Sequence, residues 1–327
     1  MNRLLLIATT ALVLTLGSVS CATPQKETPR NYRQDMRDFV QDISAYAKSI
    51  EPNFIVIAQN GHDLLLENDK GNGAPAVAYL DAIDGVGRED LLYGYNNDDV
   101  ATPISERDHF ISFMDIAENN GVEVLVTDYC SAKSFVDDSY NQNAARGYIS
   151  FAADHRDLDN IPAYPLNPFN MNSANVTSLA EAKNFLYLIN PGSYSSITDF
   201  LNAIRNTNYD VLLIDAFHEG DVLTADDIAD LKSKANGGTR LVIAYMSIGE
   251  AEDYRYYWLN EWKSNPPSWL ANENPNWPGN YKVRYWDPAW QEIIYGNDTS
   301  YLGKILDAGF NGVYLDIIDA FEYFENR

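Results

Sequence analysis

The chain has 327 residues, and its 47 acidic and 23 basic residues give a formal net charge of −24 at pH 7. This charge excludes a nucleic-acid-binding protein, because binding to phosphates requires clustered Lys and Arg side chains. Two cysteines, Cys21 and Cys130, are too few for a disulfide framework, so we expect Cys130 to be a buried thiol.

The first residues have the order of a secretory signal. Arg3 is followed by an apolar run over residues 4–16 and then by small residues that end at Cys21. We predict a signal peptide over residues 1–21 with Cys21 as the acylated residue of a lipoprotein. The residue three positions earlier is Ser18, where such sites usually have Leu.

The alternative is ordinary cleavage near Ser20 or Ala22. In both cases we expect an exported protein, either a periplasmic, outer-membrane or cell-surface lipoprotein or a secreted one. A lipoprotein would contact the membrane through its lipid alone. Residues 22–35, which contain prolines and mixed charge, have the composition of a tether.

The rest of the chain alternates short apolar runs with segments of helical spacing, which is typical of a parallel α/β fold. The predicted strands are residues 54–58, 76–83, 122–127, 147–152, 184–189, 210–214, 240–246 and 312–315. The predicted helices include residues 35–50, 106–119, 195–206, 224–235 and 299–308. This pattern favours a single (β/α)8 TIM barrel over residues 36–327. Two smaller domains would also fit the length, but no linker separates them.

Acidic and amide side chains follow most of the predicted strands. They are Gln59, Asn60, Asp84, Asp128, Asp154, Asn190, Asp215, Glu250 and Asp316. Because the carboxyl ends of barrel strands surround the active-site mouth, we expect these side chains to form a functional site there.

Residues 245–255 carry the densest group of such side chains. Glu250, Glu252, Asp253 and Arg255 follow one strand within six positions. Glycosidic cleavage needs one carboxyl group to protonate the leaving oxygen and another to act as nucleophile or base. The alternative for Glu252 and Asp253 is a helix N-terminus, where acidic residues are common.

Asp316 and Asp215 each end an apolar strand. A buried carboxylate without a partner is destabilising unless burial raises its pKa enough to neutralise it, so a functional role is expected. The structural alternative for Asp316 is an ion pair with Arg255 or Arg284.

All six tryptophans fall between residues 258 and 290, in an aromatic-rich insertion over residues 256–295. Flat aromatic rings in a loop at a barrel mouth are suited to stacking on sugar rings, and Trp277, Tyr281 and Trp286 are the candidates. The alternative is that some of these rings form the core of a small subdomain. The four histidines show no metal-binding spacing, and we expect no metal or cofactor.

Five segments resemble glycoside hydrolase family 114, the endo-α-1,4-polygalactosaminidases. They are residues 245–255 (YMSIGEAEDYR), 273–286 (ENPNWPGNYKVRYW), 309–323 (GFNGVYLDIIDAFEY), 59–61 (QNG) and 83–93 (IDGVGREDLLY). The resemblance covers nearly all of the chain after the tether. It implies hydrolysis of an α-linked, partly deacetylated galactosamine polymer, whose free amines would suit an acidic barrel.

Together with this resemblance, the strand ends give a predicted site. Asp316 and Glu250 are the main catalytic pair, with Asp253 and Asp215 in support. The predicted substrate-binding residues are Tyr245, Arg255, Trp277, Tyr281, Trp286, Tyr314, Asp319, Gln59, Asn60, Asp84 and Asp128.

The chain departs from the family in two ways. In its relatives the block similar to residues 184–323 comes first and the block similar to residues 36–158 follows, so we predict a circular permutant. The family also has a Val-Glu-Pro-Asp pattern where this chain has Val313-Tyr314-Leu315-Asp316, so Tyr314 stands at a catalytic glutamate position. This second departure motivates a rival hypothesis, a glycan-binding lipoprotein without catalysis. A structural surface protein is a third.

Overall fold

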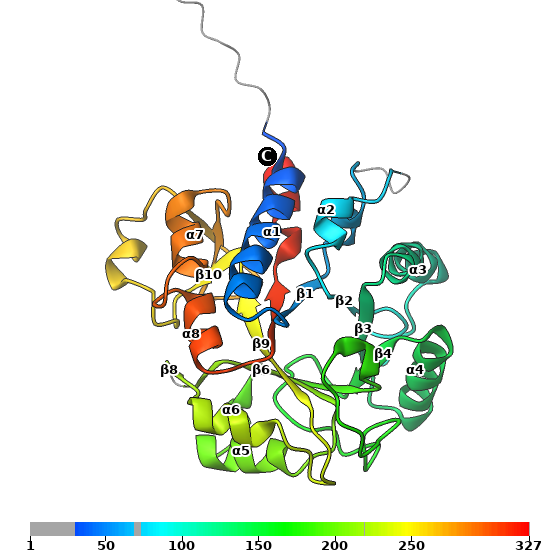
Figure 1. The fold of residues 1–327 in the computed structure, drawn as a ribbon. Coiled ribbons are helices and arrows are strands. Elements are labelled where there is room, and N and C mark those ends of the chain that lie inside the picture. The colour runs from blue at the N-terminus through cyan, green and yellow to red at the C-terminus, as the bar shows by residue number, and fades with distance from the viewer. Residues whose placement is uncertain (1–29, 69–72, 219, 327) are drawn as a thin grey trace, which may run out of the picture. The chain divides into compact units, whose positions relative to one another are not determined.

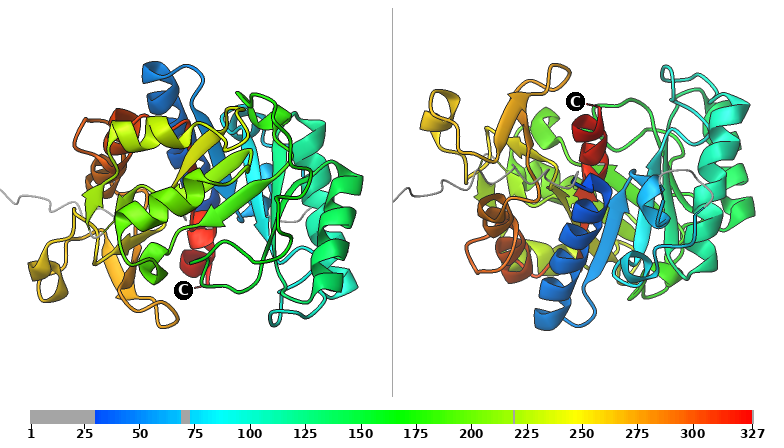
Figure 2. Two further views of the ribbon diagram at one scale, coloured as in Figure 1. Left: turned by 90° about the horizontal axis from the view of Figure 1, so that it is seen from below. Right: turned by 90° about the horizontal axis from the view of Figure 1, so that it is seen from above.

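The computed structural model describes residues 30–68, 73–218 and 220–326. The predicted signal peptide, Cys21 and most of the tether therefore lie outside the described residues. Residues from Tyr32 onward form one structural unit, an eight-stranded parallel sheet surrounded by helices (Figures 1 and 2). None of the helices in the described part combines the length and apolar character needed to cross a membrane.

The strands of the large sheet follow one another around the barrel in chain order. They are β1 Ile55–Gln59, β2 Gly85–Glu89, β3 Glu123–Tyr129, β4 Ile149–Ala153, β5 Phe185–Leu188, β6 Val211–Asp215, β9 Leu241–Ser247 and β13 Gly312–Asp316. The last strand pairs with the first, with Gly312 opposite Ile55. All the hydrogen-bonded neighbours in this sheet run parallel.

Strands β4 and β5 are the two edges of the hydrogen-bonded sheet, yet they lie next to each other. The ring centroids of Phe151 in β4 and Phe185 in β5 are 5.8 Å apart. Just beyond the strands, the Ile189 amide donates a hydrogen bond of 3.0 Å to the Leu158 carbonyl. Side-chain packing thus closes the barrel at this seam, and the predicted (β/α)8 fold is confirmed.

Helices surround the sheet on its outer side (Figure 2). They are α1 Tyr32–Ile50, α2 Val77–Leu80, α3 Ile104–Asn119, α4 Lys133–Arg146, α5 Ile197–Arg205, α6 Ala225–Leu231, α7 Pro288–Ile294, α8 Tyr301–Asp307 and α9 Phe321–Glu325. Short 3-10 turns are η1 His62–Leu65, η2 Leu179–Glu181, η3 Pro191–Ser193, η4 Asn260–Lys263 and η5 Ile318–Ala320. Ser196, Thr224 and Ser300 cap α5, α6 and α8 by accepting hydrogen bonds from backbone amides.

The first and last helices lie side by side (Figure 1). Arg33 Nε in α1 donates a hydrogen bond of 2.9 Å to Glu325 Oε1 in α9. Because α1 already begins at Tyr32, residues 32–35 belong to this helix and not to the predicted tether.

Seven of the eight predicted strands are confirmed, but residues 76–83 are not a strand. They form the short helix α2, whose Tyr79 and Leu80 are buried, and the strand β2 follows it at Gly85–Glu89. Residues 76–83 were predicted as a strand because they form a short apolar run, but this run packs as a helical turn. The true strand contains two glycines and two charged residues and so has no apolar pattern.

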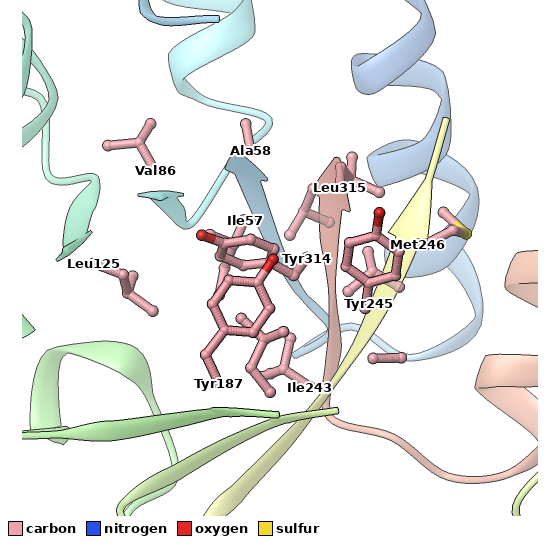
Figure 3. Close-up of a cluster of buried hydrophobic side chains, with 14 of the residues drawn as sticks. Ile57, Ala58, Val86, Leu125, Tyr187, Ile243, Tyr245, Met246, Tyr314 and Leu315 are labelled. Atoms are coloured by element: carbon pink, nitrogen blue, oxygen red, sulfur yellow. The ribbon is translucent and has the colours of Figure 1, made fainter. Parts of the chain in front are cut away.

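The interior of the barrel is filled mainly by aliphatic and tyrosine side chains. Figure 3 shows Tyr187 and Tyr314 next to each other there, and their ring centroids are 5.3 Å apart. The Tyr314 hydroxyl donates a hydrogen bond to Gln59 Oε1. A Cβ atom at Gly87 would overlap both of these oxygens, so only glycine fits at this position of β2.

Two strands of the insertion, β12 Asn280–Val283 and β11 Leu270–Glu273, form a small antiparallel sheet with β10 Glu250–Glu252, which precedes the insertion. Four tryptophans form its core. Ring centroid distances are 5.3 Å from Trp258 to Trp262, 5.0 Å from Trp262 to Trp269 and 5.0 Å from Trp269 to Trp290. Most of the tryptophans are therefore structural. A separate hairpin, β7 Phe217–His218 with β8 Asp221–Val222, follows β6.

Candidate active site

A cavity of about 330 Å³ lies at the carboxyl ends of the barrel strands. We call it the central cavity. Eight of the predicted site residues line it, namely Asn60, Asp215, Tyr245, Glu250, Arg255, Trp277, Asp316 and Asp319. They come from both halves of the chain, so the fold brings together side chains that are distant in sequence.

Asp316 ends β13 and faces this cavity. Its Oδ2 accepts a hydrogen bond of 2.6 Å from the Tyr245 hydroxyl, and its Oδ1 accepts one of 2.8 Å from the Ile317 amide. Burial raises the pKa of Asp316 to about 7, which the hydrogen bond from Tyr245 opposes and the nearby charge of Glu89 reinforces. The expected alternative, an ion pair with Arg255 or Arg284, is wrong.

Glu89 ends β2 and lines the same cavity, although it was not among the predicted site residues. The Tyr129 hydroxyl donates a hydrogen bond to its Oε1, and Asn60 Nδ2 donates one of 3.2 Å to its Oε2. The cavity therefore holds two carboxyl groups at strand ends, Asp316 and Glu89, and burial raises the pKa of Asp316.

Glu250 is buried at the cavity wall and is tied to the insertion. Its Oε1 accepts hydrogen bonds from Asn274 Nδ2 at 2.8 Å and from Lys282 Nζ at 2.5 Å. Its Oε2 has no hydrogen-bond partner among the described residues.

Asp319 also lines the central cavity. Burial raises the pKa of Asp319, and the positive charge of Lys282 opposes this shift.

Arg255 connects two further acids of the cavity. Its Nη1 is 2.8 Å from Asp215 Oδ1, and its Nε is 2.5 Å from Glu252 Oε2. Burial raises the pKa of Asp215, while the charge of Arg255 lowers it. Because Glu252 belongs to strand β10, the alternative of a helix N-terminus at this position is wrong.

Four predicted acids do not contribute to the central cavity, and one of them, Asp154, accepts a hydrogen bond of 3.2 Å from Asn160 Nδ2. Asp84 precedes β2 at the opposite end of the barrel, where it accepts a hydrogen bond from the Val56 amide and pairs with Lys48. Asp128 is fully buried and accepts hydrogen bonds from two amides and two side chains. Asp253 pairs with Lys263 Nζ at 2.7 Å on the insertion. Their carboxylates are occupied by structural contacts.

Four predicted substrate-binding residues also have structural positions. Gln59 and Tyr314 are buried and hydrogen-bonded to each other inside the barrel. Trp286 packs against Phe324 with ring centroids 4.7 Å apart. Tyr281 packs against Trp258 at 4.8 Å. These aromatic rings stabilise the insertion and its junction with the barrel.

Several cavity residues were missed by reasoning from the sequence. They are Glu89, Tyr129, Arg156, Tyr187 and Asn280. Glu89 follows the same rule as Asp316, an acid at a strand end, and would have been found if β2 had been recognised. Within the described residues, no group of His, Cys, Asp and Glu side chains has the geometry of a metal site.

The model of glycoside-hydrolase family GH114 matches residues 170–327, which include Asp215, Glu250 and Asp316. Over these residues the chain is similar to this family. The part of the barrel that carries Glu89 lies outside the GH114 match.

Three curated proteins that are similar to this chain are uncharacterized proteins. One from Methanocaldococcus jannaschii is 41% identical over 180 residues, which cover 54% of this chain and 49% of the relative. One from Deinococcus radiodurans is 42% identical over 127 residues, 39% of each chain. One from Thermotoga maritima is 42% identical over 120 residues, 37% of this chain and 36% of the relative. The chain thus spans half or less of the length of these relatives.

Proposed function

We propose that this protein is a glycoside hydrolase that cleaves an amino-sugar polysaccharide, such as an α-1,4-linked galactosamine polymer, by acid–base catalysis. The observation that carries this proposal is that Asp316 and Glu89 both line the central cavity, at the ends of β13 and β2. Glycosidic cleavage requires two carboxyl groups at one site, and burial raises the pKa of Asp316, which suits the acid of the pair. The GH114 match supports the same reaction class.

In this mechanism Asp316 is the general acid. Because burial raises its pKa to about 7, it holds a proton near neutral pH. It passes this proton to the leaving glycosidic oxygen as the bond to the anomeric carbon breaks. The Tyr245 hydroxyl stabilises the carboxylate that remains.

Glu89 acts on the other side of the bond, either as nucleophile at the anomeric carbon or as base for the attacking water. Tyr129 and Asn60 hold its two oxygens in place. Glu250 is the other candidate for this role, because its Oε2 has no partner among the described residues. We prefer Glu89, since Glu250 already compensates the charge of Lys282.

The charge of the central cavity favours an amino sugar. Six carboxyl groups line it, against two arginines. Protonated amines of a partly deacetylated polymer would be attracted to this excess of negative charge. An anionic polysaccharide would be repelled.

The proposal is tested by replacing each carboxyl group with its amide. We expect Asp316→Asn and Glu89→Gln to lower kcat by roughly 10²- to 10⁴-fold, the usual contribution of an acid or base. Glu250→Gln should have a smaller effect. The measurement is the release of new reducing ends from partly deacetylated polygalactosamine, with circular dichroism to confirm folding. Full activity of Asp316→Asn would reject the mechanism.

The second candidate function is glycan binding without catalysis, which Tyr314 favours because it replaces the glutamate of the family pattern. It predicts saturable binding of the polymer by the wild-type protein with no new reducing ends. Hydrolysis by the wild-type protein would reject it.

We also propose that the protein is exported and acylated at Cys21, on the basis of the apolar run over residues 4–16 and the small residues after it. Metabolic labelling with palmitate should mark the wild-type protein and not Cys21→Ala. Equal labelling of both would reject acylation at this residue.

A further inference from the structure

A second cavity, of about 590 Å³, opens beside the central cavity. We call it the side cavity. Residues of the loops after β4 and β5 line it, together with Phe217 and His218 of β7. Arg156, Ile189, Asn190 and Trp277 line both cavities. The two spaces therefore adjoin, and a long ligand could extend from one into the other.

The wall of the side cavity is held in place by hydrogen bonds between the two loops. Asn190 Nδ2 donates one of 2.7 Å to the Asp157 carbonyl, and Ser193 Oγ donates one of 2.7 Å to the Asp159 carbonyl. His155 Nε2 also lies 2.7 Å from Asp159 Oδ1. A ligand would thus meet a surface that is already ordered, which reduces the entropy lost on binding.

Trp277 stands at the junction of the two cavities, in the turn between β11 and β12. This residue is 62% exposed, unlike the packed tryptophans of the insertion. The turn is fixed by hydrogen bonds of 2.8 Å from the Gly279 amide to Glu273 Oε1 and from the Asp253 amide to the Gly279 carbonyl. Asn274 anchors it to Glu250 in the wall of the central cavity. An ordered turn therefore presents an exposed flat ring to the cleft.

We propose that the side cavity binds the sugar units that adjoin the unit in the central cavity, with one ring stacked on Trp277. This inference rests on the proposed function. It extends that function to a polymer with more sugar units than the two that the cleaved bond joins. The carboxylates of Asp157 and Asp159 at the rim would attract the amines of these units. Stacking supplies apolar contact, and the acids favour a cationic sugar.

Gly192 allows a direct test, because it lines the side cavity and a Cβ atom there would meet no other atom within 4 Å. Gly192→Phe should place a ring in the open space beside Gly192 and obstruct the side cavity without disturbing the barrel, and Gly192→Ala is the matched control. Trp277→Ala removes the stacking ring, and Trp277→Phe keeps a flat ring in its place.

The substrates are a disaccharide and an octasaccharide of partly deacetylated α-1,4-galactosamine. We expect Gly192→Phe to lower kcat/KM for the octasaccharide by about tenfold, the size of one good aromatic contact, with little change for the disaccharide. Trp277 lines both cavities, so Trp277→Ala should lower kcat/KM for both substrates, with the larger loss on the octasaccharide. The two control variants should remain close to wild type. Equal losses on both substrates, or none on the octasaccharide, would overturn the proposal.

Binding is measured in parallel by calorimetry with the same variants in the Asp316→Asn background, so that hydrolysis is not required. If the wild-type protein hydrolyses neither substrate but Gly192→Phe still weakens octasaccharide binding selectively, the side cavity is supported and the hydrolase is rejected. If both variants bind both lengths like the Asp316→Asn parent, or if neither oligosaccharide binds, the side cavity is rejected.

Discussion

The groups around Asp316 shift its pKa in opposite directions. Burial and the charge of Glu89 raise its pKa, whereas the hydrogen bond from Tyr245 lowers it. If Asp316 is the general acid, activity should fall as the pH rises through about 7. Tyr245→Phe removes the opposing hydrogen bond, so the pKa should rise and the alkaline limb of the kcat/KM profile should move to higher pH. An unchanged alkaline limb would contradict this assignment.

The same pKa shift predicts how folding stability depends on pH. An unfolded aspartate ionises near pH 4, whereas folded Asp316 retains its proton up to about pH 7. Stability should therefore decrease as the pH rises between these values and stay low above them. Asp316→Asn removes this penalty. Its melting temperature should exceed that of wild type at about pH 8 and match it at about pH 3. A lower melting temperature at pH 8 would be inconsistent with a buried, strained carboxylate.

At the scale of single residues, the sequence predicted the site in part. Asp215 and Asp316 were recognisable because each ends an apolar strand. Asp84 and Asp128 gave a similar signal, but their hydrogen-bond partners lie many residues away, so their structural roles could not be recognised. The sequence shows that an acid ends a strand. The fold determines whether other groups of the protein already donate hydrogen bonds to that acid.

Among the elements, β2 depends most strictly on its neighbours. Gly87→Ala places a methyl group against the Tyr314 hydroxyl and Gln59 Oε1, two buried atoms with little room to move. We expect a loss of about 1–3 kcal/mol in the free energy of unfolding, as for other overpacked cores. Urea denaturation measures this loss. Tyr314→Phe removes one of the overlapping oxygens, so the double variant should recover part of it, and strictly additive losses would contradict this explanation.

Strand β2 also explains the one error among the predicted strands. Apolar strands such as β9 are evident in the sequence because their side chains are buried on both faces. In β2, glycines at positions 85 and 87 leave space for Leu179, Tyr314 and Gln59, so other elements supply the side chains that fill the interior there. A strand whose interior is filled by its neighbours has no hydrophobic pattern of its own.

The whole molecule has two places where the chain could be opened or joined. Arg33 and Glu325 bring the first and last helices together, and the seam between β4 and β5 lacks a β ladder. The circular permutation inferred from block order stays a prediction, and these features make it testable. A permutant that joins residue 326 to residue 30 by a short flexible linker and opens beside the exposed Leu166 should fold with a melting temperature near that of wild type.

The control permutant opens between Gly61 and His62. Gly61 packs closely against Ile318, and its neighbour Asn60 holds Glu89. This opening should lower both the melting temperature and the activity. If both permutants had the same melting temperature and activity, the barrel would tolerate opening at either place. The β4–β5 seam would then have no special role.

The attachment of the insertion has a consequence for how specificity can evolve. The turn that carries Trp277 is bound to the barrel through Asn274 and Lys282, which both contact Glu250 Oε1. Asp316 and Glu89 belong to barrel strands and make their hydrogen bonds elsewhere. A homologue could therefore exchange this hairpin as a cassette and acquire a new sugar preference while the proton-transfer chemistry is inherited unchanged.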